Sequence, residues 1–394
     1  MQLSSEQKQF ILNHENENVS FLALHSSTFK GKEKQFVLAQ IAGRQISKNK
    51  IPTFYNNFDI IYPIHLSLEQ ASSEETAKYK ASLFNERRKL FVDLTGGLGV
   101  DFMFLSRCFD ESIYVEKNII LSELAEHNFN LLGLENYTVI NSEAEIIINE
   151  IRKASLIFLD PARRDNDGRK VFQIEDCSPN LISIKDLLLD KSDEVLIKYS
   201  PMLDISLALK ALDNVKQVHV VSIENECKEL LFLLSKEMTN CIYYTVNLKK
   251  NGENEVFLFN PDDEHSCTID YLAYPENYLY EPNSSILKAG GFKVLTRFYD
   301  VKKLHNHSHL YTSKELIDDF PGRIFKIEKV VSPNKKQLKS QIPEIKKANI
   351  AVRNFPMSVE KIRKLTDLKD GGDHYIFATT LYDEKKVFII CSKI

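Results

Sequence analysis

Short apolar segments alternate with longer amphipathic stretches between residues 89 and 260 of this 394-residue chain. Each apolar segment has four to six residues, and stretches of about ten residues or more with helical character separate most of them. Alternation of this kind is typical of a parallel sheet covered by helices on both faces. The predicted fold class is therefore α/β, with strands expected at 90–94, 112–116, 138–141, 156–160, 195–199 and 218–223.

Residues with strong end-of-helix preferences support this arrangement. Ser72 is followed three positions later by Glu75, a capping box that predicts a helix before the first strand. Gly133 marks the expected end of the helix after the second strand. Ser178, followed by Pro179, predicts the start of another helix, with the serine as its cap.

The regions on either side of this central part have other patterns. Residues 1–68 lack strand alternation and carry helix-favouring runs, which predicts a helical N-terminal region. Segments 243–248 and 255–259 predict an antiparallel hairpin at the sheet edge, and P-D-D-E-H-S after Asn260 predicts a linker. The remainder predicts a smaller α+β region with a helix from about Ser358. Its strands are expected near 292–299, 323–331, 349–353, 375–380 and 386–391.

Composition argues against several classes of protein. With 43% hydrophobic and 27% charged residues, the chain can bury ordinary cores and is not expected to be disordered. The polar opening and the lack of a run of about 18 apolar residues argue against secretion and membrane spanning. The six cysteines occur singly, without a C-x-x-C pair. We therefore expect reduced thiols, a cytoplasmic location and no thiolate zinc site.

Basic residues are concentrated near the C-terminus. The formal net charge is −4, but residues 301–394 hold 19 Lys and Arg against 11 Asp and Glu. Within 320–365, twelve basic residues occur with only three acids. A basic region on an acidic body favours a polyanionic partner, and the alternative is a solvated lysine-rich surface. The candidate contacts to that partner are Lys335, Lys336 and Arg353.

The strongest motif is F-V-D-L-T-G-G-L-G-V-D at positions 91–101, where the first predicted strand passes into a helix. Its glycines permit a tight turn, so a ligand can lie against bare backbone at the carboxyl edge of the sheet. Glu116 ends the second strand, where an acid can accept hydrogen bonds from ribose hydroxyls. The pattern predicts a nucleoside cofactor bound by Asp93, Thr95, Gly97, Gly99, Asp101 and Glu116.

Residues around this turn favour one cofactor over another. A dinucleotide fingerprint that starts at Gly97 would place its third glycine at Phe102, which is too bulky for close helix packing. An acid-rich turn suits a cationic sulfonium and an ammonium group better than a pyrophosphate. S-adenosylmethionine is therefore favoured over NAD, and a glycine turn without a ligand is the alternative. Glu143 could accept from an adenine amino group, although such polar turns are often only helix caps.

The segment D-P-A-R-R after the fourth predicted strand carries the candidate catalytic residues. Asp160 and Pro161 would place a carboxylate and a stiff backbone beside the cofactor, and the region of Ala162 would supply main-chain acceptors. Such groups can hold an exocyclic amine with its lone pair aimed at the methyl carbon. Arg163, counted with the catalytic group, and Arg164 would donate to phosphate, within a long loop that is a candidate lid. The alternative is a plain turn with solvated arginines.

Three further segments bear on the type of reaction. Tyr199 in K-Y-S-P is a candidate to stack on a substrate base. Because no cysteine precedes the proline there, covalent C5 methylation of a pyrimidine is disfavoured, with Cys177 as the one alternative thiol. H-N-H-S-H at 305–309 would place three imidazoles on one face of a strand. No carboxylate or thiolate is spaced with them, so no metal site is predicted.

Several motifs together resemble a known family. They are D-L-T-G-G-L-G-V-D, E-Q-A-S-S-E-E-T-A-K-Y-K, D-P-A-R-R with E-D-C-S-P-N, A-N-I-A-V-R-N-F-P and L-K-D-G-G-D-H-Y-I-F-A-T-T-L. They look like the class I methyltransferases of Bacteroidetes that carry a C-terminal THUMP-like domain, and the resemblance covers nearly the whole chain. It implies a Rossmann-like domain with a mostly parallel seven-stranded sheet. The domains expected are a helical region 1–68, a methyltransferase domain 69–262, a ferredoxin-like segment 263–320 and a THUMP-like domain 321–394.

This resemblance also implies a function. True THUMP domains belong to RNA-modifying enzymes, so the family resemblance implies methylation of structured RNA, at a base nitrogen. Amino-directed methyltransferases usually have two prolines and an aromatic residue after the strand, whereas Ala162 and Arg163 follow Pro161 here, so the methylated atom stays open. A small-molecule or protein methyltransferase, and an RNA-binding protein with a vestigial cofactor site, remain alternatives. The oligomeric state is also open, with a monomer among the possibilities.

Overall fold

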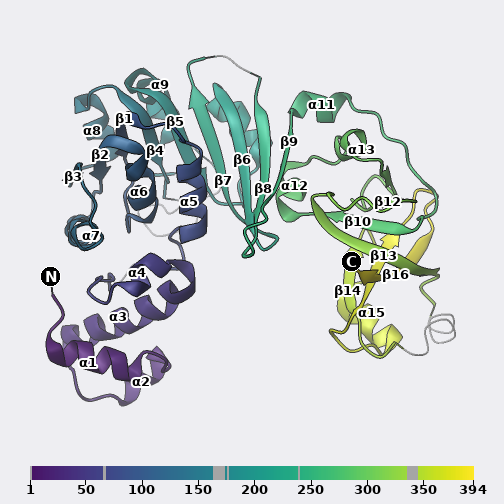
Figure 1. Ribbon diagram of the computed structural model, residues 1–394, viewed down its shortest axis with the longest axis horizontal. Helices are drawn as coiled ribbons and strands as arrows, with labels where there is room; N and C mark the ends of the chain where they lie inside the picture. The colour runs from purple at the N-terminus through teal and green to yellow at the C-terminus, as the bar shows by residue number, and fades with distance from the viewer. Residues whose placement is uncertain (1, 65–67, 163–173, 175–176, 238–239, 335–344) are drawn as a thin grey trace. The chain divides into compact units, whose positions relative to one another are not determined.

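The computed structural model describes residues 2–64, 68–162, 174, 177–237, 240–334 and 345–394. These residues form two compact units, coloured by position along the chain in Figure 1. The first unit comprises Met1–Lys216 with Leu231–Thr239, and the second comprises Gln217–Leu230 with Asn240–Ile394. Each unit is described by itself.

Helices form the N-terminal part of the first unit, as the sequence predicts. Ser4 and Gln7 form a capping box at the first helix, and an asparagine cap begins the second. Ile11, Leu22 and Ile41 are buried in a shared core between the helices. These helices are α1 (Ser5–His14), α2 (Val19–His25), α3 (Gly31–Lys50) and α4 (Pro52–Asn56).

A parallel sheet follows in the same unit, in the order β3-β2-β1-β4-β5. Its central strands are almost wholly buried, because apolar side chains fill both faces. The strands are β1 (Arg88–Asp93), β2 (Phe109–Val115), β3 (Tyr137–Ile140), β4 (Ala154–Leu159) and β5 (Ser192–Tyr199). The helices of this part are α5 (Glu74–Ser82), α6 (Val100–Leu105), α7 (Ile119–Leu131), α8 (Ala144–Glu150), α9 (Leu181–Lys191) and α10 (Ile205–Leu212).

The strand order continues β5-β7-β6-β8-β9. The predicted hairpin is confirmed, because β8 and β9 pair antiparallel. The expected count of seven strands is too low: the described residues give nine, and β7 has no counterpart among the expected strands. Glu224 and Asn225, both at positive φ, form the two-residue turn between β6 and β7 that sequence reasoning missed. These strands are β6 (Val215–Ile223), β7 (Glu226–Ser235), β8 (Ile242–Leu248) and β9 (Glu255–Phe259).

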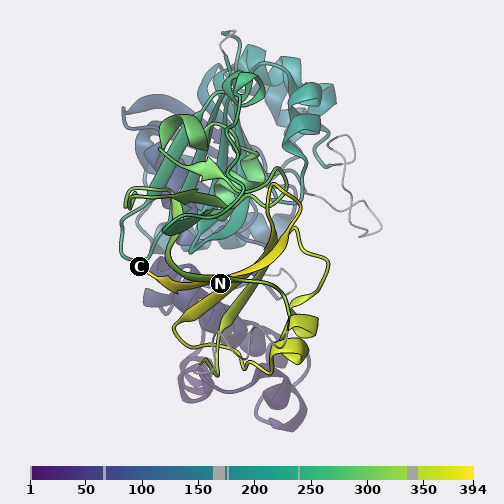
Figure 2. The same ribbon diagram turned by 90° about the vertical axis from the view of Figure 1, so that its right-hand side faces the viewer.

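The rest of the second unit contains a sheet of seven strands in the order β11-β12-β10-β13-β16-β15-β14. In Figures 1 and 2 it is drawn in green to yellow, with α15 beside its β14 edge. The strands are β10 (Tyr278–Pro282), β11 (Lys302–Lys303), β12 (Tyr311–Ser313), β13 (Gly322–Val331), β14 (Asn349–Arg353), β15 (His374–Thr380) and β16 (Lys386–Lys393). The helices are α11 (Pro261–Ser266), α12 (Ser284–Ala289), α13 (Leu295–Phe298) and α15 (Val359–Thr366).

Some local predictions are wrong. Ser73, not Ser72, caps α5, and Asn180, not Ser178, caps α9. In both places a neighbouring polar side chain competes for the same free N–H groups, and spacing alone does not decide between them. The expected linker after Asn260 is the short helix α11, because Asn260 accepts from the amide of Asp262 and so supplies a cap.

Two segments expected to form strands do not. Residues 292–299 contain α13 instead of a strand. The histidines at 305–309 lie in a turn, so they do not share the face of a strand. None of the described helices is long and apolar enough to cross a membrane.

Candidate active site at the carboxyl edge of the sheet

The glycine turn after β1 has the tight geometry that the sequence predicts. Gly97 and Gly99 both adopt positive φ, at +56° and +72°. A Cβ on Gly96 would lie 2.1 Å from the ring of Tyr114, and one on Gly99 would lie 2.4 Å from the ring of Phe129. A Cβ on Gly97 would meet only a backbone oxygen, 3.8 Å away. Gly96 and Gly99 therefore allow close packing against aromatic rings. Gly97 is the glycine with open space beside its Cα, where a ligand can approach.

Glu116 lies beside this turn, as expected. One of its carboxylate oxygens accepts from the amide of Gly97 at 2.9 Å, and the other accepts from the amide of Asn118 at 2.8 Å. The hydroxyl of Tyr114 donates to the carbonyl of Gly97 at 2.5 Å. The turn is thus fastened to the end of β2, and an acid stands at its rim.

Asp93, at the end of β1, is almost completely buried. Its carboxylate accepts from the amide of Thr95 at 2.9 Å. The hydroxyl oxygen of Thr95 in turn accepts from the amide of Asp160 at 2.6 Å, which links the ends of β1 and β4. Burial raises the pKa of Asp93 well above its ordinary value, with further contributions from the nearby Asp101 and Asp160 carboxylates.

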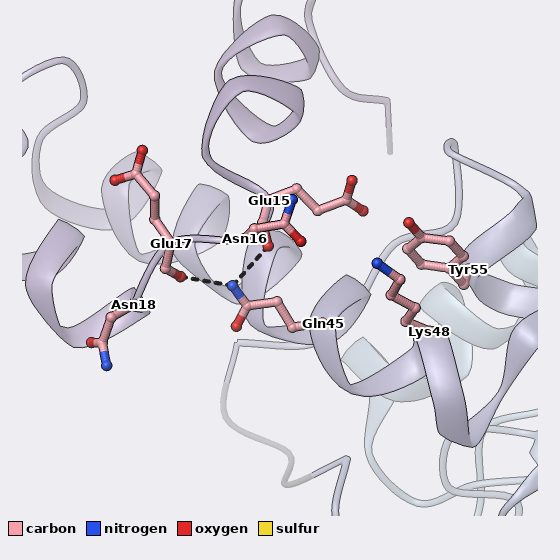
Figure 3. A pocket seen from close by; sticks show the side chains of 7 residues that line it. All are labelled: Glu15, Asn16, Glu17, Asn18, Gln45, Lys48 and Tyr55. Carbon is pink, nitrogen blue, oxygen red and sulfur yellow. Dashed lines mark hydrogen bonds between the residues drawn. The ribbon is translucent and has the colours of Figure 1, made fainter.

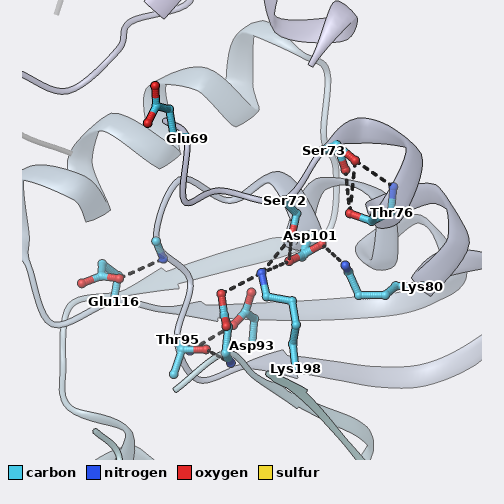
Figure 4. A network of polar contacts seen from close by, with 12 residues as sticks. Glu69, Ser72, Ser73, Thr76, Lys80, Asp93, Thr95, Asp101, Glu116 and Lys198 are labelled. Carbon is cyan, nitrogen blue, oxygen red and sulfur yellow. Dashed lines mark hydrogen bonds and ion pairs between the residues drawn. The ribbon is translucent and has the colours of Figure 1, made fainter. Parts of the chain in front are cut away.

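A network of buried charges extends from the start of α6 to the end of β4 (Figure 4). The Nζ atom of Lys198, on β5, lies 3.2 Å from a carboxylate oxygen of Asp101 and 2.7 Å from one of Asp160. The ammonium of Lys80, on α5, lies 3.1 Å from the other carboxylate oxygen of Asp101. Ser72 donates to Asp101 at 2.6 Å and accepts from Lys198 at 2.8 Å.

Asp101 is held as an anion by this network. Burial opposes its ionisation, but the ammonium groups of Lys198 and Lys80 and the hydroxyl of Ser72 outweigh burial and lower its pKa. Asp93 and Asp101, both expected at the cofactor, therefore have pKa values shifted in opposite directions. Asp93 is shifted towards the neutral form, and Asp101 towards the charged form.

Asp160 differs from these two acids in exposure. Its side chain is 40% exposed, whereas those of Asp101 and Lys198 are both 9% exposed. The structure therefore brings the expected catalytic carboxylate to the surface of the site, at the end of a buried chain of ion pairs. Of the other expected cofactor residues, Glu143 is exposed at the turn before α8 and makes no capping bond to that helix.

Comparison with known proteins identifies the family. The ferredoxin-like domain model matches residues 278–321, and the THUMP domain-like model matches residues 322–393. A crystal structure described as a "putative methyltransferase" from Porphyromonas gingivalis W83 is 32% identical, with a TM-score of 0.88 and both chains fully covered. The chain belongs to the family of class I methyltransferases with a C-terminal THUMP-like domain. None of the curated proteins matches the sequence.

More distant structures share only part of the chain. A SAM-dependent methyltransferase from Agrobacterium tumefaciens is 18% identical and covers 45% of this chain and 65% of its own, with a TM-score of 0.33. A Streptococcus mutans structure, described as "a putative methyltransferase" in complex with SAH, is 16% identical, with coverages of 41% and 97% and a TM-score of 0.32.

Two residues expected to face the substrate, Ala162 and Tyr199, are engaged in other contacts. The main chain of Ala162 is not free, because its amide and carbonyl pair with Ser178 at 2.8 and 3.1 Å. Tyr199 is buried and packs edge-on against Phe232 at 6.0 Å, so its ring is not presented for stacking on a base. Tyr199 lies on a strand that is buried on both faces, so its ring packs with the core.

Arg353 is likewise engaged elsewhere. Its guanidinium lies 2.6 Å from the buried carboxylate of Glu281, so it is part of an ion pair and not a free phosphate contact. The remaining candidates, Arg163, Arg164, Lys335 and Lys336, lie outside the described residues, as does most of the expected lid. Pro161 follows Asp160 at the end of β4, where the sequence places it.

Sequence reasoning missed Ser72, Lys80 and Lys198 as site residues. Ser72 and Lys80 belong to E-Q-A-S-S-E-E-T-A-K-Y-K, one of the motifs that carry the family resemblance. Lys198 belongs to K-Y-S-P, at the end of the fifth strand. The lysine within the apolar run at 195–199 was the available signal, since lysine is rarely buried without a partner.

Other features of the molecule are separate from this site. In the described part of the chain, no group of three or more His, Cys, Asp or Glu side chains is placed to hold a metal ion. His305 contacts Asn354 and Glu384, and His309 stacks on Phe292. A polar surface hollow of about 420 Å³ lies in the N-terminal helical region (Figure 3). It is lined by Glu15, Asn16, Glu17, Asn18, Gln45, Lys48 and Tyr55.

Proposed function

We propose that this protein is an S-adenosylmethionine-dependent methyltransferase that acts on a base nitrogen of structured RNA in the cytoplasm. The observation that carries the catalytic part is the half-exposed Asp160 beside the open Gly97 turn. A carboxylate there can accept from an exocyclic amine and hold its lone pair towards a methyl donor. Methyl transfer is an in-line displacement, so orientation supplies much of the rate and no strong base is required.

The residues around the turn suit this cofactor. Glu116 would accept from the ribose hydroxyls, the open face of Gly97 would lie against the ligand, and Glu143 would accept from the adenine amino group. The cofactor is cationic at sulfur and supplies the methyl group. Lys80 and Lys198 together balance the charges of Asp101 and Asp160, so Glu116 leaves the edge with a surplus of negative charge. An acid-rich edge favours a sulfonium over a pyrophosphate.

The RNA part of the proposal rests on the C-terminal region. Residues 322–393 match a THUMP domain-like model, and residues 320–365 contain an excess of basic residues. Several of these are exposed on the second unit, among them Lys346, Lys347, Lys361 and Lys364. Their charges are available for phosphate contacts, in contrast to that of Arg353.

The decisive experiment compares modified nucleosides in RNA from a gene-deletion strain and its parent by mass spectrometry. We expect one methylated nucleoside to disappear in the deletion strain. Tritium transfer from labelled cofactor to a deletion-strain extract, fractionated into RNA, protein and small molecules, identifies the acceptor class. Label in the protein or small-molecule fraction alone would favour the alternative methyltransferases. RNA binding without label in any fraction would favour a vestigial site.

Salt dependence tests the basic region directly. If Lys346 and Lys347 bind phosphates, a Lys346→Ala/Lys347→Ala variant should bind RNA more weakly. Removing one lysine–phosphate ion pair should flatten the slope of log affinity against log salt by roughly 0.7 to 0.9. A Lys30→Ala/Lys32→Ala variant removes the same charge from exposed positions in the N-terminal region and serves as the control. Equal slopes in all three proteins would remove these lysines from the RNA interface.

A further inference from the structure

We propose that Lys198 is a positioning residue that fixes the Asp160 carboxylate for methyl transfer, an inference that rests on the proposed function. Lys198 lies one residue before the end of β5, inside the sheet edge that carries the site. Its ammonium contacts Asp160 at 2.7 Å, Ser72 at 2.8 Å and Asp101 at 3.2 Å. The three acceptors come from the end of β4, the segment before α5 and the first turn of α6.

Two of these contacts hold the ammonium in place. Asp101 and Ser72 are both buried, and they are hydrogen-bonded to each other. Lys80, fully buried, holds the second oxygen of Asp101 and so keeps that carboxylate from rotating. A lysine side chain normally loses considerable rotamer entropy when it is fixed. Here the buried network holds the Lys198 ammonium before any ligand binds, since such networks are rigid when satisfied.

The third contact transmits this rigidity to the exposed end of the network. Among the described residues, Lys198 is the cation within ion-pair distance of Asp160. The carboxylates of Asp101 and Asp160 both lie close enough to Asp93 to act on it electrostatically. Lys198 lies between Asp101 and Asp160 and offsets the repulsion of the two carboxylates. Without it, the Asp160 side chain would be free to turn away from its neighbours.

Position matters more than affinity for a group in this role. A residue that orients a reacting amine must be held to within about half an ångström. A displacement of about 1 Å can lower the rate on the order of 100-fold. Lys198 contacts the cofactor turn through Asp101, whose other oxygen is still held by Lys80. Loss of Lys198 should therefore lower turnover and leave cofactor binding largely intact.

The test uses full-length Lys198→Met, whose side chain is apolar and similar in length. The assay follows tritium transfer from labelled cofactor to the fractionated deletion-strain extract, and calorimetry follows S-adenosylhomocysteine binding. We expect kcat to fall about 30- to 100-fold, with KM for the cofactor and the affinity for S-adenosylhomocysteine changing less than about 3-fold. Lys303→Met removes another buried lysine, from the second unit, and should leave both measurements unchanged.

A double variant separates positioning from a general structural effect. If Lys198 acts through Asp160, Lys198→Met should cost little further activity in an Asp160→Ala background, because the two changes remove one function. Losses that multiply would overturn the proposal, and so would wild-type turnover in Lys198→Met. A fall in S-adenosylhomocysteine affinity as large as the fall in kcat would also overturn it, because Lys198 would then serve the cofactor through Asp101.

Two remaining outcomes are also decisive. If Lys198→Met does not fold, Ser72→Ala weakens the hold on the ammonium without removing a charge, and we expect a fall in kcat of about 3- to 10-fold. Unchanged turnover in Ser72→Ala would then contradict the positioning role. If the wild-type protein labels no fraction at all, the proposed function itself fails, and the role of Lys198 falls with it.

Discussion

Asp101 and Glu281 are both held between two cations, but their surroundings differ. Asp101, in the first unit, lies between Lys80 and Lys198. Glu281, in the second, accepts from Arg323 and lies 2.6 Å from Arg353. Both acids are buried. The Asp101 cluster continues through a shared lysine to a half-exposed acid beside an open glycine turn. The Glu281 cluster ends at its two arginines.

The Glu281 cluster has a clear structural role. Glu281 on β10 is directly opposite Arg323 on β13, and Arg353 ends β14. Glu281 therefore links the ferredoxin-like segment, residues 278–321, to the THUMP-like segment, residues 322–393. The strands of the two segments form one continuous sheet. Arginine suits this task because its planar fork binds a carboxylate in fixed geometry. Basic residues counted in the sequence are thus not all available to a polyanion.

The largest expected effect is on cofactor binding. Gly97→Val should abolish S-adenosylhomocysteine binding, because a branched side chain at positive φ strains the turn and fills the space in front of it. Gly133→Val is the matched control, since Gly133 also has positive φ with nothing within 4 Å, at the end of α7. Calorimetry on both proteins measures the difference. Equal loss in the two variants would mean that backbone strain, not ligand space, is responsible.

Next in size is the contrast between the two clusters. Asp160→Ala should lower turnover on the order of 100-fold and leave cofactor affinity much less affected, because the carboxylate acts mainly in the transition state. Glu281→Gln should leave turnover unchanged and lower the free energy of unfolding by about 1 to 3 kcal/mol, since the partners are only partly exposed arginines. Methyl-transfer assays and urea unfolding of both variants decide it. Wild-type turnover in Asp160→Ala would remove that residue from the mechanism.

The sequence predicts local structure here better than partnerships. The strands β1 to β6 and the turn at Gly97 follow from apolar runs and glycines, which act over a few residues. Ser72 and Lys198 are 126 positions apart, and only the completed sheet brings them together. A residue pattern cannot show that a lysine in β5 meets an aspartate after β4, because parallel strands place their ends side by side through intervening helices.

The same limit explains why some residues have surroundings other than those expected. Arg353 is a residue type that often binds phosphate. Its ion-pair partner Glu281 lies on another strand, far away in the sequence, so the sequence pattern does not show the pair. Tyr199 has the right ring for stacking, but it lies on a strand that is buried on both faces. β7 was missed because the turn before it contains Glu224 and Asn225 and no glycine. Its apolar run at 230–234 was the signal that could have revealed it.

The smallest expected effect concerns a buried lysine outside both clusters. Lys303 is 1% exposed, and its ammonium donates to the carbonyl of Asn306 and lies 5.4 Å from the ring centre of Phe292. No carboxylate is within ion-pair distance of it in the described part of the chain, in contrast to Lys80 and Lys198. Burial lowers the pKa of Lys303 to about 8, with Glu264 opposing this shift and Lys293 adding to it.

This depressed pKa makes stability depend on pH in a defined direction. Between pH 8 and about 10.5 the unfolded chain keeps a proton on Lys303 that the folded protein has lost, so its contribution to stability rises with pH. Below pH 8 both states are protonated, and the burial penalty is constant. Urea unfolding of wild type and Lys303→Met at pH 7.5, 8.5 and 9.5 isolates this group, because tyrosines titrate alike in both proteins. The stability of wild type relative to Lys303→Met should rise by on the order of 1 kcal/mol over this range. A difference that stays constant with pH would show that this lysine is solvated well enough to keep its charge without a carboxylate.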